Sequence, residues 1–124
     1  MYGVELTKKA MQVLKPALPF AKGTIKAEIS QGISQLYMTD LGNLYVVARP
    51  EGAELVIVAV AGFNLLHSQQ EILQFAKSQG FQSIRFHTRY PEHLKKGLGG
   101  LRYTLVEIRQ RVFGNNEHVF KVNI

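Results

Sequence analysis

Cysteine is absent from the 124-residue chain, and aspartate occurs only once, at Asp40. The first absence excludes disulfide frameworks, thiolate nucleophiles and zinc sites with cysteine ligands. The glutamates are scattered, so neither paired carboxylates for acid–base catalysis nor a serine–histidine–aspartate arrangement emerges. No run approaches the ~18 apolar residues that a membrane helix needs. Met1 to Ala10 lack the apolar core of a signal peptide, so we expect a cytoplasmic protein.

What the chain does contain is enough apolar material for a folded core. Hydrophobic residues make up 46% of it and charged residues 19%, unlike a disordered segment. The length predicts a single domain over residues 1–124. Lys and Arg number 15 against 9 for Asp and Glu, a net charge of +6 that favours anionic partners without identifying one.

The N-terminal part predicts two helices. Apolar residues at helical spacing indicate a helix over Glu5–Lys15, which two prolines end. Thr24 is expected to cap a second helix. Its apolar stripe is predicted at Ile25, Ile29, Ile33 and Leu36, with Gly32 either weakening the helix or marking its end. A short strand is expected at Gln35–Thr39.

The middle of the chain predicts a strand–helix–strand unit that follows a hairpin. Leu44 to Ala61 indicate the hairpin, and its second strand, Glu54–Ala61, is nearly all apolar. Such a strand is buried on both faces, so we expect it at the centre of the sheet. The core is predicted to include Val56, Ile57, Val58 and Val60. An amphipathic helix over His67–Gln79, ended by Gly80, and a strand over Gln82–Thr88 complete a parallel βαβ crossover.

The C-terminal part predicts a short helix at Pro91–Lys96, a strand at Tyr103–Val112 and a last strand at Glu117–Ile124. Alternation places Thr104, Val106 and Ile108 on one face, and Tyr103, Leu105, Glu107, Arg109 and Arg111 on the other. We expect the last strand at a sheet edge, where a second copy packs to give a homodimer. The fold class is therefore α/β (α+β): a single mixed, mostly antiparallel sheet with a central βαβ unit and flanking helices.

This order resembles the acetyltransferase-like fold of the GCN5-related (GNAT) superfamily. ELVIVAVAG, at Glu54–Gly62, is similar to the family's fourth strand. EILQFAKSQGFQSIRFHT, at Glu71–Thr88, is similar to its long helix and fifth strand. PEHLKKGLGGLRYTLVEIRQRV, at Pro91–Val112, is similar to its short helix and sixth strand. ISQGISQLYMT, at Ile29–Thr39, resembles small GNAT-like proteins of phages and Mu-like prophages. The resemblance implies a GNAT-like fold over most of the chain.

The turn after the fourth strand departs from the family. The resemblance implies a Q/R-x-x-G-x-G/A loop there, whose backbone holds the pyrophosphate of acetyl-CoA. This chain has one glycine in the turn, no basic residue, and bulky side chains that obstruct a close cradle. Gly62, Asn64 and Ser68 are the candidate cofactor-binding residues. We expect no cofactor, or acetyl-CoA if the chain is an enzyme.

Other candidate chemistry is sparse. The resemblance implies a tyrosine acid after the short helix, and Tyr103 is the candidate catalytic residue. The histidines have no zinc spacing, so no metal site is expected. His87, near a strand end, is interpreted as a polar edge residue in preference to a general base. A basic cluster is the candidate nucleic-acid or anion surface: Arg85, Arg89, Lys95, Lys96, Arg102, Arg109 and Arg111.

Three functions are compatible with these features. The first is a small phage- or prophage-type protein that keeps the GNAT-like scaffold without catalysis and acts through protein interaction, in virion assembly or on a host factor. The second is a divergent acetyl-CoA-dependent N-acyltransferase, and the third a weak, non-specific nucleic-acid binder. The crowded turn after Gly62 favours the first and leaves enzymatic activity open. Expected partners are a second copy or another protein, and no membrane.

Overall fold

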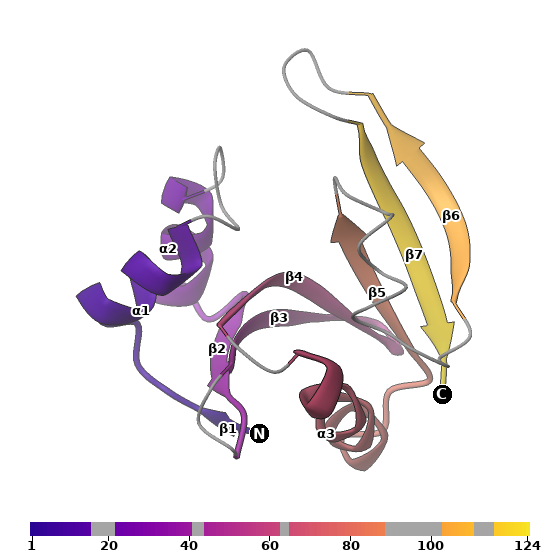
Figure 1. The fold of residues 1–124 in the computed structure, drawn as a ribbon, viewed down its shortest axis with the longest axis horizontal. Coiled ribbons are helices and arrows are strands. Elements are labelled where there is room, and N and C mark those ends of the chain that lie inside the picture. The colour runs from indigo at the N-terminus through magenta and orange to yellow at the C-terminus, as the bar shows by residue number, and fades with distance from the viewer. Residues whose placement is uncertain (16–21, 41–43, 63–64, 89–102, 111–115) are drawn as a thin grey trace.

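A computed structural model describes residues 1–15, 22–40, 44–62, 65–88, 103–110 and 116–124 of the chain (Figure 1). These residues form one seven-stranded sheet in the order β1-β2-β3-β4-β5-β7-β6. All neighbouring strands run antiparallel except β4 and β5, which are parallel. The predicted fold class is confirmed. The expected helix at Pro91–Lys96 lies outside the described residues.

The strands follow the apolar runs of the sequence closely. Their bounds are β1 Tyr2–Gly3, β2 Gln35–Met38, β3 Leu44–Glu51, β4 Glu54–Gly62, β5 Ser83–Thr88, β6 Thr104–Arg109 and β7 Glu117–Asn123. The predicted hairpin is β3–β4, and its turn uses Gly52 at a φ of 61°, a value that side-chain-bearing residues rarely adopt. Among the described strands, β1 alone was not predicted from the sequence.

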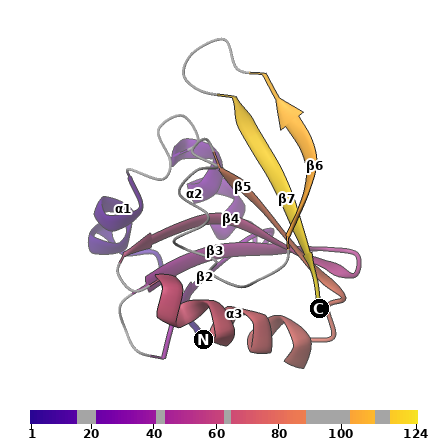
Figure 2. The same cartoon turned by 45° about the vertical axis from the view of Figure 1, so that its right-hand side comes forward.

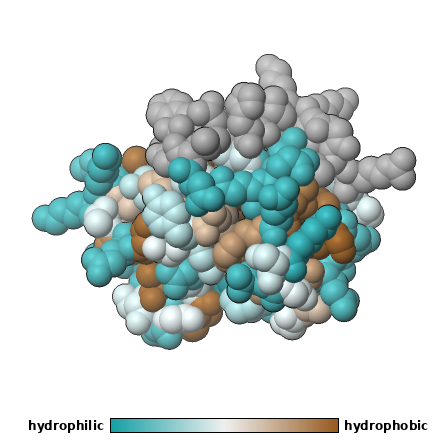
Figure 3. Space-filling view, turned by 90° about the horizontal axis from the view of Figure 1, so that it is seen from below, coloured by the Kyte–Doolittle hydropathy of each residue, from teal (hydrophilic) through white to brown (hydrophobic). Residues whose placement is uncertain are grey.

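Helices cover both faces of the sheet. On one face lie α1, Lys8–Leu14, and α2, Lys22–Ser30; on the other lies α3, Leu65–Ser78 (Figure 2). Thr7 caps α1, because its hydroxyl oxygen accepts a hydrogen bond from the Ala10 N–H at 3.1 Å. Hydrophobic side chains seen from below lie in separate patches between hydrophilic ones (Figure 3).

Two expectations for the second helix are wrong. It begins at Lys22, before the predicted cap at Thr24, and it ends at Ser30. Ile33 therefore lies outside the helix and is 49% exposed, while Leu36 is buried in β2. Gly32 has a φ of 77°, so the backbone leaves the helix there and the apolar stripe cannot continue.

The core consists of two clusters, one on each face of the sheet. Ile72 and Ala76 of α3 pack on one face, and Ala10, Leu14 and Ile25 of α1 and α2 pack on the other. As predicted, β4 is the central strand, with Val56 and Ile57 buried. Full burial of Glu54–Ala61 is contradicted, because Val58 and Val60 are only partly buried.

The C-terminal hairpin differs from its predicted arrangement. The last strand, β7, lies between β5 and β6, so the edge strand is β6 and the expected edge position of β7 is wrong. Leu105 is opposite Phe120 and Glu107 is opposite Val119, which leaves Val106 as an extra, bulged residue. From Val106 onward, the bulge reverses which face of the sheet each β6 side chain occupies, relative to simple alternation. Thr104 and Ile108 therefore lie on opposite faces, and so do Leu105 and Glu107.

No helix in the described ranges has both the length and the apolar character needed to cross a bilayer.

Candidate functional site

The central feature of the sheet is the point at which β4 and β5 separate. Their parallel pairing runs from Glu54 opposite Ser83 to Ile57 opposite Phe86, although β4 continues to Gly62. On its other side, β4 places Ile57 and Ala59 against consecutive residues of β3, so Val58 is bulged. A bulge bends its strand and increases the local twist. The bulge therefore explains why β4 turns away from β5 at this residue (Figure 1).

Among the described residues, the separation leaves part of β4 without a neighbour on the β5 side. Beyond Ile57, no residue of β4 pairs with a described residue of β5. Unpaired backbone N–H and C=O groups in the middle of a sheet need other partners. An extended molecule that carries amide groups can supply them by adding to the strand edge. The open stretch of β4 is thus a candidate binding edge.

His87 stands next to this separation, near the end of β5. Its Nδ1 lies 2.5 Å from Oε1 of Glu117 on β7, and the exposed fractions of the two side chains are 18% and 13%. Val119, directly opposite His87 on β7, is 1% exposed. The expectation that His87 is a polar edge residue is wrong, because β5 is an inner strand and the imidazole is paired with a carboxylate.

The pair fixes which imidazole nitrogen can take a proton. An ionised carboxylate only accepts hydrogen bonds, so Nδ1–H of His87 donates to Glu117. Nε2 then carries the free lone pair of the neutral ring. That atom is buried, and no described residue hydrogen-bonds to it. An amine or hydroxyl that reached Nε2 would supply the missing partner and could pass its proton there.

The pair faces the same side of the sheet as α1 and α2. Arg49 of β3, Val56 of β4 and Arg85 of β5 lie opposite one another in register. Arg49 Nη1 donates to Glu28 Oε1 of α2 at 3.0 Å, which assigns this row to the α2 face. His87 follows Arg85 by two residues and so points to the same side.

Tyr103, the candidate catalytic residue, lies on the opposite face. Its ring makes edge contacts with Phe86 and Phe120, at centroid distances of 6.5 Å and 5.2 Å. His118 stacks on Phe120 at 6.3 Å, which completes an aromatic row beside β5. Tyr103 is therefore packed among aromatic rings, and its role as an acid stays a prediction.

The three candidate cofactor residues follow β4. Gly62 ends the strand, is exposed and has a φ of 130°. Asn64 lies outside the described residues. Helix α3 begins at Leu65, earlier than expected, so Ser68 lies inside it, 1% exposed, and does not cap its start. A cofactor-binding role for these residues stays a prediction.

Of the predicted basic cluster, Arg85 and Arg109 are described. Arg85 pairs with Glu51 and Glu54, and Arg109 lies 3.3 Å from Glu107. These carboxylates neutralise both arginines, which weakens the electrostatic attraction of the arginines for phosphates. The remaining cluster residues lie outside the described ranges: Arg89, Lys95, Lys96, Arg102 and Arg111.

Two groups with shifted pKa values lie away from the site. Burial raises the pKa of Tyr37, which packs edge-on against Phe75 at 5.0 Å. Partial burial lowers the pKa of the Met1 ammonium, but Glu71 and Asp40, at 2.7 Å and 2.9 Å, outweigh it and bring the pKa above its ordinary value.

Sequence reasoning missed the essential features of the site, the Val58 bulge and the His87–Glu117 pair. Thirty residues separate His87 from Glu117, and their contact depends on β7 inserting beside β5. The alternation of Ile84 and Phe86 with Arg85 and His87 was the only available signal, because it places His87 on the polar face of its strand.

Comparisons with known proteins identify the fold. No family model matches the sequence, and no curated protein matches it. The ribosomal-protein-S18-alanine N-acetyltransferase of Escherichia coli is similar in structure, with a TM-score of 0.64 at 10% identity over 99% of this chain and 93% of that one. An acetyltransferase from Bacillus cereus ATCC 14579 has a TM-score of 0.50 at 16% identity, over 100% of this chain and 98% of that one. The predicted GNAT-like fold is confirmed, and the likeness at these identities concerns the fold alone.

Proposed function

We propose that the chain is an N-acyltransferase that moves an acyl group from a coenzyme A thioester to an amine, with His87 as general base. One observation carries the proposal. A partly buried histidine, oriented by Glu117 and with an Nε2 to which no described residue hydrogen-bonds, stands where β4 and β5 separate. A carboxylate that holds the far nitrogen of an imidazole both orients it and stabilises its protonated form.

The chemistry requires one proton acceptor. The attacking amine forms a bond to the thioester carbonyl carbon, the carbon–sulfur bond breaks, and the nitrogen loses a proton. Nε2 of His87 accepts that proton, and Glu117 stabilises the resulting imidazolium. The departing thiolate takes a proton from water, or from Tyr103 if the prediction for that residue holds. The thioester supplies the activated acyl group, and the chain supplies the base and the binding edge.

The described residues fit an acyl-CoA donor in part. The amide-bearing arm of coenzyme A suits the stretch of β4 beyond Ile57 that pairs with no described residue of β5. The phosphate end would meet the turn after Gly62, whose lack of glycines and basic residues argued against binding. The proposal therefore predicts that the arm and the acyl group provide more of the affinity than the phosphates do.

A second candidate function is protein interaction without catalysis, as first expected from the sequence. Exposed apolar side chains on the edge strand β6 favour it: Leu105, Val106 and Ile108 are 47%, 56% and 50% exposed. A second copy that pairs along β6 would cover them. The phage or prophage origin, the role in virion assembly or host contact, and the cytoplasmic location stay predictions.

Activity measurements on variants test the proposal. Release of free thiol from acetyl-CoA would be followed with amino acids, polyamines and peptides with free N-termini as acceptors. The peptides are included because the E. coli enzyme is an alanine N-acetyltransferase by name. H87Q should lower kcat/KM by about 10²- to 10⁴-fold, the usual contribution of a general base. E117Q should lower it less and change its pH profile, since Glu117 acts through His87.

His118 provides a matched control. It is also a partly buried histidine at this end of the sheet, but it stacks on Phe120 on the opposite face from His87. H118Q should keep near-wild-type activity. Equal losses in H87Q and H118Q would contradict the role of His87, and no thiol release with any acceptor would favour the interaction function.

A further inference from the structure

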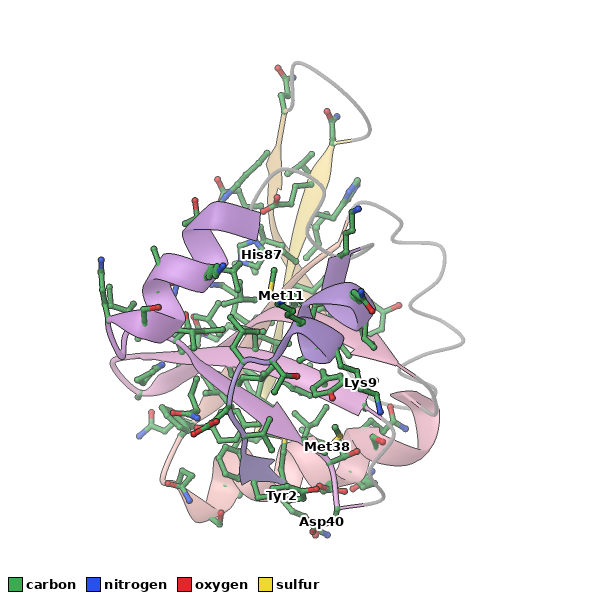
Figure 4. The ribbon with its side chains drawn as sticks, turned by 90° about the vertical axis from the view of Figure 1, so that its left-hand side faces the viewer. Tyr2, Lys9, Met11, Met38, Asp40 and His87 are labelled. Atoms are coloured by element: carbon green, nitrogen blue, oxygen red, sulfur yellow. The ribbon has the colours of Figure 1, made fainter. Side chains whose placement is uncertain are left out.

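A groove between α1 and α2 lies outside the site at β4 and β5. Its volume is about 420 Å³, within the range of ligand pockets. The described residues lining this α1–α2 groove are Leu6, Thr7, Lys8, Met11, Gln12, Lys15 and Lys26. Leu6 and Met11 are partly buried and form an apolar floor, and the lysines are exposed. The Met11 side chain lies between the two helices, whereas Lys9 leaves α1 away from α2 (Figure 4).

Among the described residues, nothing compensates the positive charge of the α1–α2 groove. No acidic residue is among its described lining residues. Within the described ranges, no ion pair joins Lys8, Lys15 or Lys26 to a carboxylate, whereas Arg49, Arg85 and Arg109 are all paired. Three unneutralised ammonium groups around an apolar floor favour a ligand that carries both carboxylates and an apolar side chain.

The spacing of the lysines narrows the ligand class. Lys8 and Lys15 lie seven residues apart, about 10 Å along the helix axis at a rise of 1.5 Å per residue. In an extended peptide, side chains that share a face recur every two residues, so two carboxylates four residues apart lie about 13 Å apart, and the side chain midway between them points the same way. The flexible lysine side chains can span the difference from the helix spacing. Nucleic acids match the charge, but their backbone offers no aliphatic side chain for the floor at Leu6 and Met11.

We propose that the α1–α2 groove binds an acidic peptide segment of a partner protein, with carboxylates on its lysines and an apolar side chain on Met11. This binding goes beyond the proposed acyl transfer, because it needs neither an acyl donor nor His87. The two proposals can therefore fail separately.

Fluorescence anisotropy of labelled peptides tests the proposal on the full chain. The probe is a short peptide with glutamates two residues before and two residues after a leucine, and the comparison peptides replace the leucine with glycine or the glutamates with lysines. Saturable binding of the first peptide, weaker binding of the glycine peptide and none of the lysine peptide are expected. The K8E/K26E double variant should bind about tenfold more weakly. M11A should lower affinity for the leucine peptide more than for the glycine peptide.

Lys9 supplies the matched control on the same helix. K9E makes the same change of charge on a residue that does not line the groove, so it should leave affinity close to that of the wild type. Equal loss of peptide affinity in K8E and K9E would overturn the proposal, since binding of the peptide would then depend on the net charge of the protein and not on the groove. A single-stranded oligonucleotide that binds more tightly than the peptide, and is weakened by K8E/K26E, would assign the groove to nucleic acid. Absence of saturable peptide binding at near-physiological salt would also refute it.

Discussion

Shortening Ile57 to alanine tests the central position of β4. Ile57 is 7% exposed, belongs to the core cluster on the α3 face and is the last β4 residue paired with β5, opposite Phe86. Replacing a buried isoleucine with alanine costs about 2–5 kcal/mol, through lost burial and the cavity that remains. We expect about 3 kcal/mol, because Phe86 is only partly buried and can relax into part of the space.

Urea unfolding followed by far-ultraviolet circular dichroism would measure this change. The urea concentration at the unfolding midpoint should fall. The slope of the unfolding free energy against urea concentration should stay unchanged, which indicates lost stability without a change in the unfolded state. Val106→Ala is the control. Val106 is 56% exposed, so its truncation should cost less than about 0.5 kcal/mol. A loss below about 0.5 kcal/mol for Ile57→Ala would refute the packing described for β4.

Two further predictions concern the two edges of the sheet. Glu71→Gln removes a carboxylate that pairs with the Met1 ammonium at 2.7 Å and should cost less than about 1 kcal/mol, because solvent screens this pair. The folded-state pKa of that ammonium is raised, so the contribution is complete below its unfolded pKa and is lost as the pH rises through the folded value. Urea unfolding of both proteins at neutral and alkaline pH should therefore give a difference that shrinks at alkaline pH, and a constant difference would contradict the assignment. Leu105→Asp with Ile108→Asp should convert a dimer formed along β6 to a monomer in sedimentation equilibrium, and a wild-type monomer would contradict the dimer.

The βαβ unit was predictable because its signals are local. An uninterrupted apolar run indicates a buried strand, and the period of α3 and the glycine after it mark the helix and its end. Gly80, with a φ of 87°, stands where that stop was expected. β1 has only two residues, both exposed, so no periodicity could reveal it.

The arrangement in space was less predictable, since it depends on contacts between distant segments. Chain order placed the last strand at an edge, whereas β7 inserts between β5 and β6. The bulges at Val58 and Val106 change the register of strand pairing, and no residue type at these positions predicts them. The site depends on both kinds of feature, which explains why His87 and Glu117 were not paired from the sequence.

Titration of acetyl-CoA into the isotope-labelled chain, followed by amide NMR shifts, tests the proposed function most directly. The account predicts saturable binding, with the largest shifts at Val58–Ala61 of β4 and at His87 on β5, where the strands separate. Absence of binding, or shifts confined to residues far from this separation, would contradict it.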